Sequence, residues 1–169
     1  PVRKVSIIPR GRALGVTLST PENDRYGYDE AYLRGRIIGA LGGMAAEDTV
    51  YGVITTGAES DLETSTSIAR QMVGRWGMSE AIGPLQIYPQ EGSPQDQGFS
   101  DELLARADDE ARRIVDECYS QAKQLLLTNR ERLDGIVDAL MEHETLDQAQ
   151  VYAAAGVMPG QAPNDMVSA

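Results

Sequence analysis

Residues 55–62 read Thr55-Thr56-Gly57-Ala58-Glu59-Ser60-Asp61-Leu62, and a helical pattern of apolar residues starts here. Small and apolar side chains then recur at helical spacing, at Leu62, Ile68, Ala69, Met72, Val73 and Trp76. Thr56 and Glu59 have the spacing of a Thr-x-x-Glu capping box, which predicts that the helix begins near Gly57. Asp61 then falls past the first turn, at the edge of the apolar stripe.

The carboxylate of Asp61 needs a partner if this edge of the helix is buried. Past the first turn, its interaction with the helix dipole is weak. An unpaired buried carboxylate is costly, and the usual remedies are a cationic side chain, hydrogen bonds or a metal ion. From its own pattern, Asp61 is therefore either a residue with a salt bridge or capping role, or a metal ligand.

The composition is that of a globular chain with one substantial domain or two small ones. The 169 residues are 41% hydrophobic and 24% charged, and aromatic residues make up only 5%. A core built mainly from aliphatic side chains favours helices over a β-sandwich. The net charge of -11 opposes phosphate backbones, so we expect no nucleic-acid partner. Cys118 is the single cysteine, and we interpret it as a small core residue.

The N-terminal pattern predicts a β-hairpin. Val5 and Ile7 alternate with polar residues, a turn-rich stretch follows at 9–12, and Leu14, Val16 and Leu18 alternate again. Two strands alone are marginal in water, so the hairpin must lean on helices or pair with something else.

A glycine-rich helix is expected next, capped by Asp29 and running to about Val50. Apolar residues recur every four positions and should form its inner face, at Leu33, Ile37, Leu41 and Ala45. Glycines repeat in the same way, at Gly35, Gly39 and Gly43. Two interpretations stay open: the close approach of another backbone along this face, and, as the alternative, local flexibility or a break after Gly42-Gly43.

The C-terminal part predicts two long helices and a short one. Ser100 caps a helix whose stripe is Leu104, Ala107, Ala111, Ile114, Val115, Cys118, Ala122 and Leu125. Thr128-x-x-Glu131 is expected to open a second helix, with Leu133, Ile136, Val137 and Leu140 facing inward. The short link predicts an antiparallel pair. Thr145-x-x-Gln148 is expected to cap a last helix that ends at Gly156.

Residue types alone indicate little chemistry. The sequence has no Gly-rich phosphate loop, no Cys or His pair at metal-ligand spacing, and no nucleophile elbow. The only histidine, His143, falls near a helix end, where we expect it to lie in solvent. No apolar run is long enough to cross a bilayer, since the longest weakly polar stretch covers residues 37–46.

Several motifs occur in one order along the chain. They are Lys4-Val5-Ser6-Ile7-Ile8-Pro9-Arg10-Gly11-Arg12-Ala13-Leu14-Gly15, then Leu41-Gly42-Gly43 with Ala45-Ala46-Glu47, then Thr55-Thr56-Gly57-Ala58 with Asp61-Leu62. Further along come Ala69-Arg70 with Met72-Val73, Trp76-Gly77-Met78-Ser79-Glu80, Gly83-Pro84 and Glu144-Thr145-Leu146. In these motifs, the chain from Val2 to Ala155 resembles the peptidase domain of the FtsH-type proteases, which are membrane-anchored, ATP-dependent zinc metalloproteases.

This resemblance implies a mainly helical zinc peptidase domain, with one N-terminal β-hairpin and a C-terminal antiparallel helix pair. It implies an upstream AAA+ domain that binds ATP, a homohexamer, and unfolded or tagged proteins as substrates. Membrane contact would be made only through N-terminal segments outside this sequence, with the peptidase domain in the cytoplasm of a bacterium or in the organellar equivalent. In the family, a His-Glu-x-x-His helix supplies two zinc ligands and a glutamate general base, and an aspartate at the position of Asp61 supplies the third ligand.

The chain departs from the family pattern because it contains no His-Glu-x-x-His. It also begins with Pro1 rather than Met, so we expect a C-terminal piece cut after that helix, with an incomplete zinc site and no catalytic residue of its own. The alternative is a non-catalytic relative that serves as an oligomerisation scaffold. Glu47 is expected either to support the metal site or to anchor the glycine-rich helix, and we favour the anchoring role.

Substrate would bind as an extended chain, and the strand Leu14-Gly15-Val16-Thr17-Leu18 is a candidate edge for pairing with it. The alternative is that this strand only completes the hairpin. We expect a peptidase-domain fragment over residues 1–158, divided into a catalytic-core part at 1–84, a loop at 85–99 and C-terminal helices at 100–158. Residues 159–169 are expected to be a disordered tail.

Overall fold

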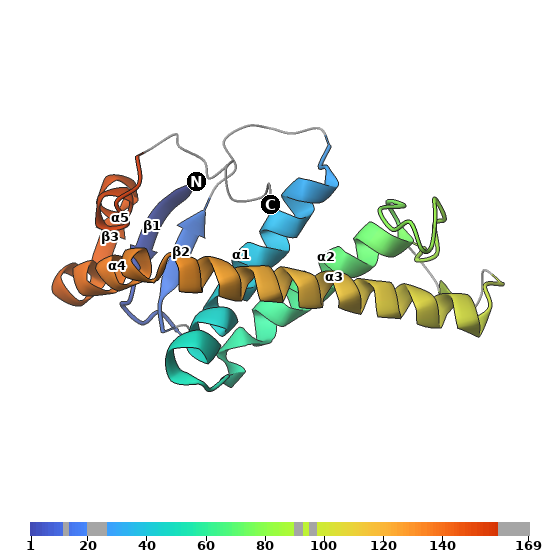
Figure 1. The fold of residues 1–169 in the computed structure, drawn as a ribbon, viewed down its shortest axis with the longest axis horizontal. Helices are drawn as coiled ribbons and strands as arrows, with labels where there is room; N and C mark the ends of the chain where they lie inside the picture. Colours follow the sequence, from blue (N-terminus) through green and yellow to red (C-terminus); the bar gives the residue numbers. More distant parts are fainter. Residues whose placement is uncertain (12–13, 20–26, 90–92, 95–97, 159–169) are drawn as a thin grey trace. The chain divides into compact units, whose positions relative to one another are not determined.

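The computed structural model describes residues 1–11, 14–19, 27–89, 93–94 and 98–158. These residues form two compact units, which we call the sheet unit (residues 1–25 with 129–169) and the helical unit (residues 26–128). The chain is mainly helical, as predicted (Figure 1). Within its described parts, no helix combines the length and the apolar character needed to span a bilayer.

The helical unit contains α1 (Glu30–Tyr51), the 3-10 turn η1 (Thr56–Ala58), α2 (Glu59–Gly74) and α3 (Asp101–Thr128). The three α-helices pack on one another, and their inner faces share one hydrophobic core (Figure 1). The cap of α1 is confirmed, because the Asp29 carboxylate accepts a hydrogen bond from the backbone N–H of Tyr32 at 2.8 Å. The four residues predicted for its inner face are all buried, namely Leu33, Ile37, Leu41 and Ala45.

Among the described residues, the glycine row of α1 has neither a close backbone neighbour nor a break after it, and local flexibility stays a prediction. A Cβ added at Gly35, Gly39 or Gly43 would find nothing within 4 Å, so no described backbone approaches this face closely. The helix also does not break after Gly42-Gly43, because it continues to Tyr51. It ends where Gly52 adopts a left-handed conformation (φ 68°) and donates its N–H to Asp48 O at 3.0 Å.

Helix α3 follows the predicted stripe. Ser100 caps it, since Ser100 Oγ accepts a hydrogen bond from the N–H of Leu103 at 3.2 Å. The buried face comprises Ala107, Ala111, Ile114, Cys118 and Ala122. Cys118 is fully buried, and this burial raises the pKa of its thiol, which confirms its interpretation as a core residue.

The segment between α2 and α3 is tied to both helices. Gly74 O, at the end of α2, accepts hydrogen bonds from the N–H groups of Ile87 (2.7 Å) and Tyr88 (3.0 Å). Ser79 Oγ donates to the Glu110 carboxylate of α3 at 2.9 Å. The predicted loop at 85–99 therefore begins with well-bonded backbone, whereas its residues 90–92 and 95–97 lie outside the described residues.

The sheet unit contains β1 (Val2–Ser6), β2 (Val16–Ser19), α4 (Arg130–His143), β3 (Thr145–Asp147) and α5 (Gln148–Ala154). The hairpin is confirmed, with Lys4 opposite Leu18 and Ser6 opposite Val16. Its sheet has a third strand that we did not predict, because β3 pairs antiparallel with β1 and gives the order β2-β1-β3.

Two predicted caps in the sheet unit are wrong. Thr145 lies in β3, and the capping box of α5 is formed by Asp147 and Gln150, each side chain bonded to the other residue's backbone N–H at 2.9 Å. Thr128 is the last residue of α3, and the residue before α4, Asn129, makes no side-chain cap.

The predicted antiparallel pairing of the two C-terminal helices stays a prediction, because α3 belongs to the helical unit and α4 to the sheet unit. Within its own unit, α3 packs on α1 and α2. Helix α4 packs on α5 and β3, around Leu140, Leu146 and Val151. Val137, predicted to face inward, is 46% exposed. The domain bounds inside 1–158 stay a prediction, and the tail at 159–169 lies outside the described residues.

Candidate functional site

Asp61 lies in the first turn of α2, which corrects the predicted start of this helix. Thr56 does not cap α2, whose N-cap residue, Ala58, makes no side-chain cap. Thr55 instead caps the 3-10 turn that precedes α2, because its backbone is extended and its Oγ1 accepts a hydrogen bond from the N–H of Gly57 at 3.3 Å. Residues 56–58 then form a 3-10 turn before α2 begins at Glu59. The positive end of the helix dipole is therefore available to Asp61 after all.

The Asp61 side chain is half-buried rather than enclosed. The described residues offer its carboxylate no hydrogen-bond donor or cationic partner, unlike the carboxylates of Glu47, Asp48 and Glu110 nearby in the same unit. Of the sequence-based interpretations, the salt bridge thus finds no support in this part of the chain. The carboxylate is positioned at a helix start and is open to a ligand.

Glu47 of α1 fixes the segment that leads to Asp61. Its carboxylate accepts hydrogen bonds from the backbone N–H of Thr55 (2.9 Å) and from Thr55 Oγ1 (2.9 Å). Because Thr55 Oγ1 also accepts from Gly57, one carboxylate orders both the cap and the 3-10 turn. The contact supports the anchoring role favoured for Glu47, although the residue anchored is Thr55 of the Asp61 segment.

Asp48 holds the same end of α1 against α3. Its Oδ2 accepts hydrogen bonds from Lys123 Nζ (2.7 Å) and from the Tyr119 hydroxyl (2.8 Å). The hydrogen bond from Lys123 lowers the pKa of Asp48, with that of Tyr119 adding to the effect. Burial raises the pKa of Tyr119 to about 12, so its hydroxyl stays protonated and donates at neutral pH. The consecutive residues Glu47 and Asp48 thus connect α1 to the Asp61 segment and to α3.

The described residues do not by themselves form a metal site. Within them, no three histidine, cysteine, aspartate or glutamate side chains lie close enough to hold a metal ion. Catalytic zinc needs three protein ligands. The single histidine, His143, lies in the last turn of α4 in the other unit, with its side chain half exposed. Asp61 therefore needs partners from outside the described residues if it is to bind zinc.

Of the candidate substrate strand, Leu14 and Gly15 precede β2, and the other three residues lie in β2, which is an edge strand of the sheet that the described residues form. All four residues of β2 are exposed, with Val16 at 46% and Leu18 at 51% exposed. Leu14 is 84% exposed. Gly15 packs closely against β1, since an added Cβ would lie 2.7 Å from Ser6 O. The strand belongs to the sheet unit and Asp61 to the helical unit.

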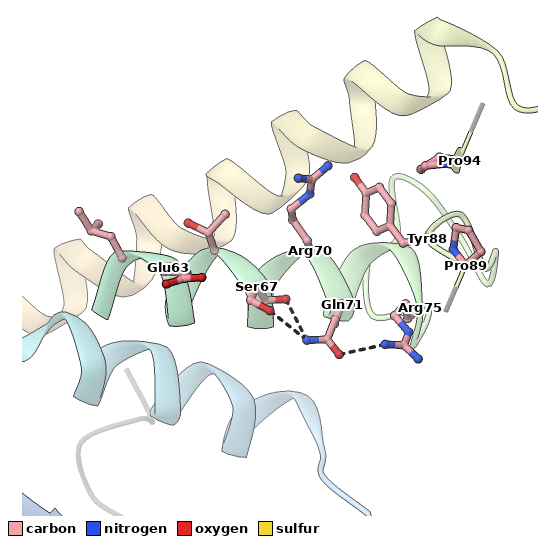
Figure 2. Close-up of a pocket in the computed structure, with 10 residues that line it drawn as sticks. Glu63, Ser67, Arg70, Gln71, Arg75, Tyr88, Pro89 and Pro94 are labelled. Atoms are coloured by element: carbon pink, nitrogen blue, oxygen red, sulfur yellow. Dashed lines mark hydrogen bonds between the residues drawn. The ribbon is translucent and has the colours of Figure 1, made fainter. Parts of the chain in front are cut away.

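A groove that the sequence did not indicate runs along α2. It has a volume of about 760 Å³ and lies between residues of α2 and the segment that starts at Tyr88. Figure 2 shows Ser67 and Gln71 on α2 and Arg75 directly after the helix, with Arg70 and Tyr88 on the side of α3. The groove begins at Leu62, directly after Asp61 in the chain.

The chain matches the family model described as peptidase family M41 over residues 1–154. It is 54% identical over 161 residues to ATP-dependent zinc metalloprotease FtsH 3 of Conexibacter woesei, covering 93% of this chain and 22% of that protein. It is 51% identical over 165 residues to ATP-dependent zinc metalloprotease FtsH of Thermobaculum terrenum, covering 93% and 25%. For the FtsH of Bacillus subtilis the identity is 41% over 158 residues, covering 89% and 25%.

These matches show that the chain belongs to peptidase family M41 and is similar to FtsH zinc metalloproteases over most of its length. The expected family resemblance is thereby confirmed. The chain spans only about a quarter of the length of these relatives.

Proposed function

We propose that this chain is the C-terminal part of an ATP-dependent zinc metalloendopeptidase that degrades proteins. The observation that carries the proposal is the Asp61 carboxylate. It lies at a helix start in a segment fixed by Glu47, and no described residue pairs with it. A carboxylate with this exposure and no competing cation is suited to become one ligand of a divalent ion. The names of the relatives supply the metal, zinc, and the ATP dependence.

The zinc site would be completed by the part of the protein that precedes this sequence. The family pattern places two histidines and a glutamate base there, so the 169 residues contribute a ligand and no catalytic residue. We further propose that the complete protein is a membrane-anchored homohexamer with an AAA+ domain, acting on unfolded or tagged proteins. The contribution of this chain is to hold Asp61 at a fixed place through Glu47 and Thr55.

The proposal is tested on the full-length protein. We expect about one zinc ion per subunit by elemental analysis, and degradation of an unfolded protein such as casein that requires ATP and stops when zinc is chelated. A full-length protein that binds no zinc and degrades nothing, yet assembles into a stable oligomer, would favour the scaffold alternative.

The free edge of β2 supports a proposal about how substrate is held. The N–H of Ile7 donates to Glu144 O at 3.0 Å, on the β3 side of the sheet. Neighbouring residues of a strand turn their backbone N–H and C=O groups to opposite sides, so the backbone groups of Ser6 point toward β2. Those of its partner Val16 point back toward β1. Thr17 then presents its N–H and C=O at the free edge, where an extended peptide can add as a further strand.

Proline at position 17 tests this strand pairing. Thr17→Pro removes an N–H at the free edge of β2 without removing a hydrogen bond to β1. In the full-length enzyme we therefore expect the KM for an unfolded substrate to rise about three- to tenfold, which corresponds to the loss of one or two backbone hydrogen bonds. Cleavage kinetics measure the effect. Val16→Pro is the contrast, because it should disrupt the hairpin itself. An unchanged KM in a folded Thr17→Pro enzyme would contradict pairing at this edge.

A further inference from the structure

Ser65 has the one buried side-chain nitrogen or oxygen atom of the described residues that lacks a hydrogen-bond partner. Its exposed fraction is 0%, so its hydroxyl is out of reach of bulk water. Within α2, whose residues are all described, the other buried positions carry no polar side chain, namely Ile68, Ala69, Met72, Val73 and Gly74. A buried hydroxyl without a partner costs free energy that alanine would not, so a serine at this position needs an explanation.

Ser65 lies one helical turn after Asp61, on the same face of α2. Residues four apart in a helix are neighbours on its surface, with Cβ atoms about 5–6 Å apart. Side chains of a helix lean toward its N-terminus, so the Ser65 hydroxyl leans toward the turn of Asp61. Ala58, three residues before Asp61, is also buried. The half-buried Asp61 therefore lies between two buried positions of one face.

The unpaired groups of Ser65 and Asp61 are chemically complementary. A serine hydroxyl has a hydrogen to donate, an ionised carboxylate only accepts, and a hydrogen bond between the two is stronger than one between neutral groups. The two groups are not bonded to each other in this structure, and rotation about their side-chain bonds can join them at this spacing. Carboxylates that bind a metal are in turn hydrogen-bonded, which fixes their orientation.

We propose that Ser65 is a positioning residue for Asp61. Its hydroxyl donates a hydrogen bond to the Asp61 carboxylate when zinc is bound, and it thereby holds the carboxylate in the orientation of a ligand. The inference rests on the proposed protease function, because it assigns a partner to the proposed zinc ligand. The alternative is a purely structural role, in which the hydroxyl bonds to the backbone C=O of Asp61, as serine hydroxyls can within a helix.

The zinc affinity of the full-length protein, measured by competition with a chelator, tests this role. We expect Ser65→Ala to weaken zinc binding about ten- to hundredfold, the usual effect of losing a residue that supports a metal ligand. Because the lost hydroxyl has no partner among the described residues, the zinc-free variant should unfold at the temperature of the wild type or above it. A purely structural hydroxyl would leave the zinc affinity unchanged.

Ser79→Ala is the matched control. Ser79 is also buried, at 5% exposed, but its hydroxyl is already bonded to the Glu110 carboxylate at 2.9 Å. Removing this hydroxyl leaves a hydrogen bond unmade, so the variant should unfold at a lower temperature than the wild type. Its zinc affinity should be that of the wild type. The two serine variants should therefore have opposite effects on stability and on zinc binding.

A double-mutant cycle shows whether Ser65 acts through Asp61. Asp61→Ala removes the acceptor, so adding Ser65→Ala to this variant should cause no further loss of zinc affinity. Wild-type zinc affinity in Ser65→Ala, or an equal loss with and without the Asp61 carboxylate, would overturn the positioning role while leaving the protease function intact. A wild-type protein that binds no zinc would instead contradict the protease function, on which the role of Ser65 rests.

Discussion

Replacing Asp61 by asparagine in the full-length protein is expected to abolish proteolysis while ATP hydrolysis continues. Asparagine keeps the shape of the side chain and removes the negative charge that a zinc ligand supplies. Loss of a residue that only supports a zinc ligand lowers zinc affinity roughly ten- to hundredfold. Loss of a direct ligand such as Asp61 should lower it at least as much. Folding should be little affected, because the half-buried carboxylate has no bonding partner among the described residues. Zinc content, casein degradation and ATPase rate measure the three effects.

Glu59→Gln is the matched control for this variant. Glu59 lies in the same first turn of α2 and is exposed, so its carboxylate has the same favourable interaction with the helix dipole. We expect this variant to keep its zinc and its proteolysis. Wild-type zinc content and proteolysis in Asp61→Asn would refute the ligand role and leave the helix dipole as the explanation of Asp61.

Gly74→Ala is expected to destabilise the helical unit by about 1–3 kcal/mol, the usual cost of inserting a methyl group into a packed site. A Cβ at this position would overlap the ring of Tyr88. The ring cannot move away easily, because the backbone N–H of Tyr88 is bonded to Gly74 O and its hydroxyl is bonded to Asp108 at 3.0 Å. Urea unfolding of the 169-residue chain, followed by circular dichroism, measures the loss.

Gly39→Ala provides the opposite case on α1. An added Cβ there meets nothing within 4 Å, so alanine should stabilise the helix by about 0.5–1 kcal/mol through its higher helix propensity. Equal effects of the two substitutions on the free energy of unfolding would show that the contact between Gly74 and Tyr88 does not set the stability of this unit.

The buried faces of the long helices were predictable from the sequence. In α1 and α3 the apolar residues repeat over several turns, and a repeat of that length leaves only one face to bury. Ile37 and Ile114, near the middles of these helices, are both completely buried as the periodicity predicts. At the helix ends the pattern fades, and Trp76 just after α2 is 45% exposed.

The starts of α2 and α5, unlike those of α1 and α3, were not predictable, because they depend on contacts between elements. Thr55 and Thr56 are equally good caps by residue type, and Glu47 of α1 selects Thr55 by bonding its N–H and hydroxyl. Likewise, Thr145 has a capping pattern but pairs with β1, where its Oγ1 lies 2.7 Å from Ser6 Oγ. A strand of three residues is too short to show alternation in the sequence.

The candidate site was likewise predictable only in part. The sequence singled out Asp61 through a family motif, and the relation of the chain to peptidase family M41 is confirmed. The half-buried state of its carboxylate and the groove along α2 could not be predicted, because both depend on how α2 packs against neighbouring segments.

The most direct test of the zinc assignment is a crystal structure of the full-length, zinc-loaded protein with anomalous data collected at the zinc absorption edge. A carboxylate oxygen of Asp61 about 2.0–2.2 Å from the zinc peak, beside two histidine nitrogens, is the predicted result. A zinc ion ligated entirely by other residues, with the Asp61 side chain in solvent, would contradict it.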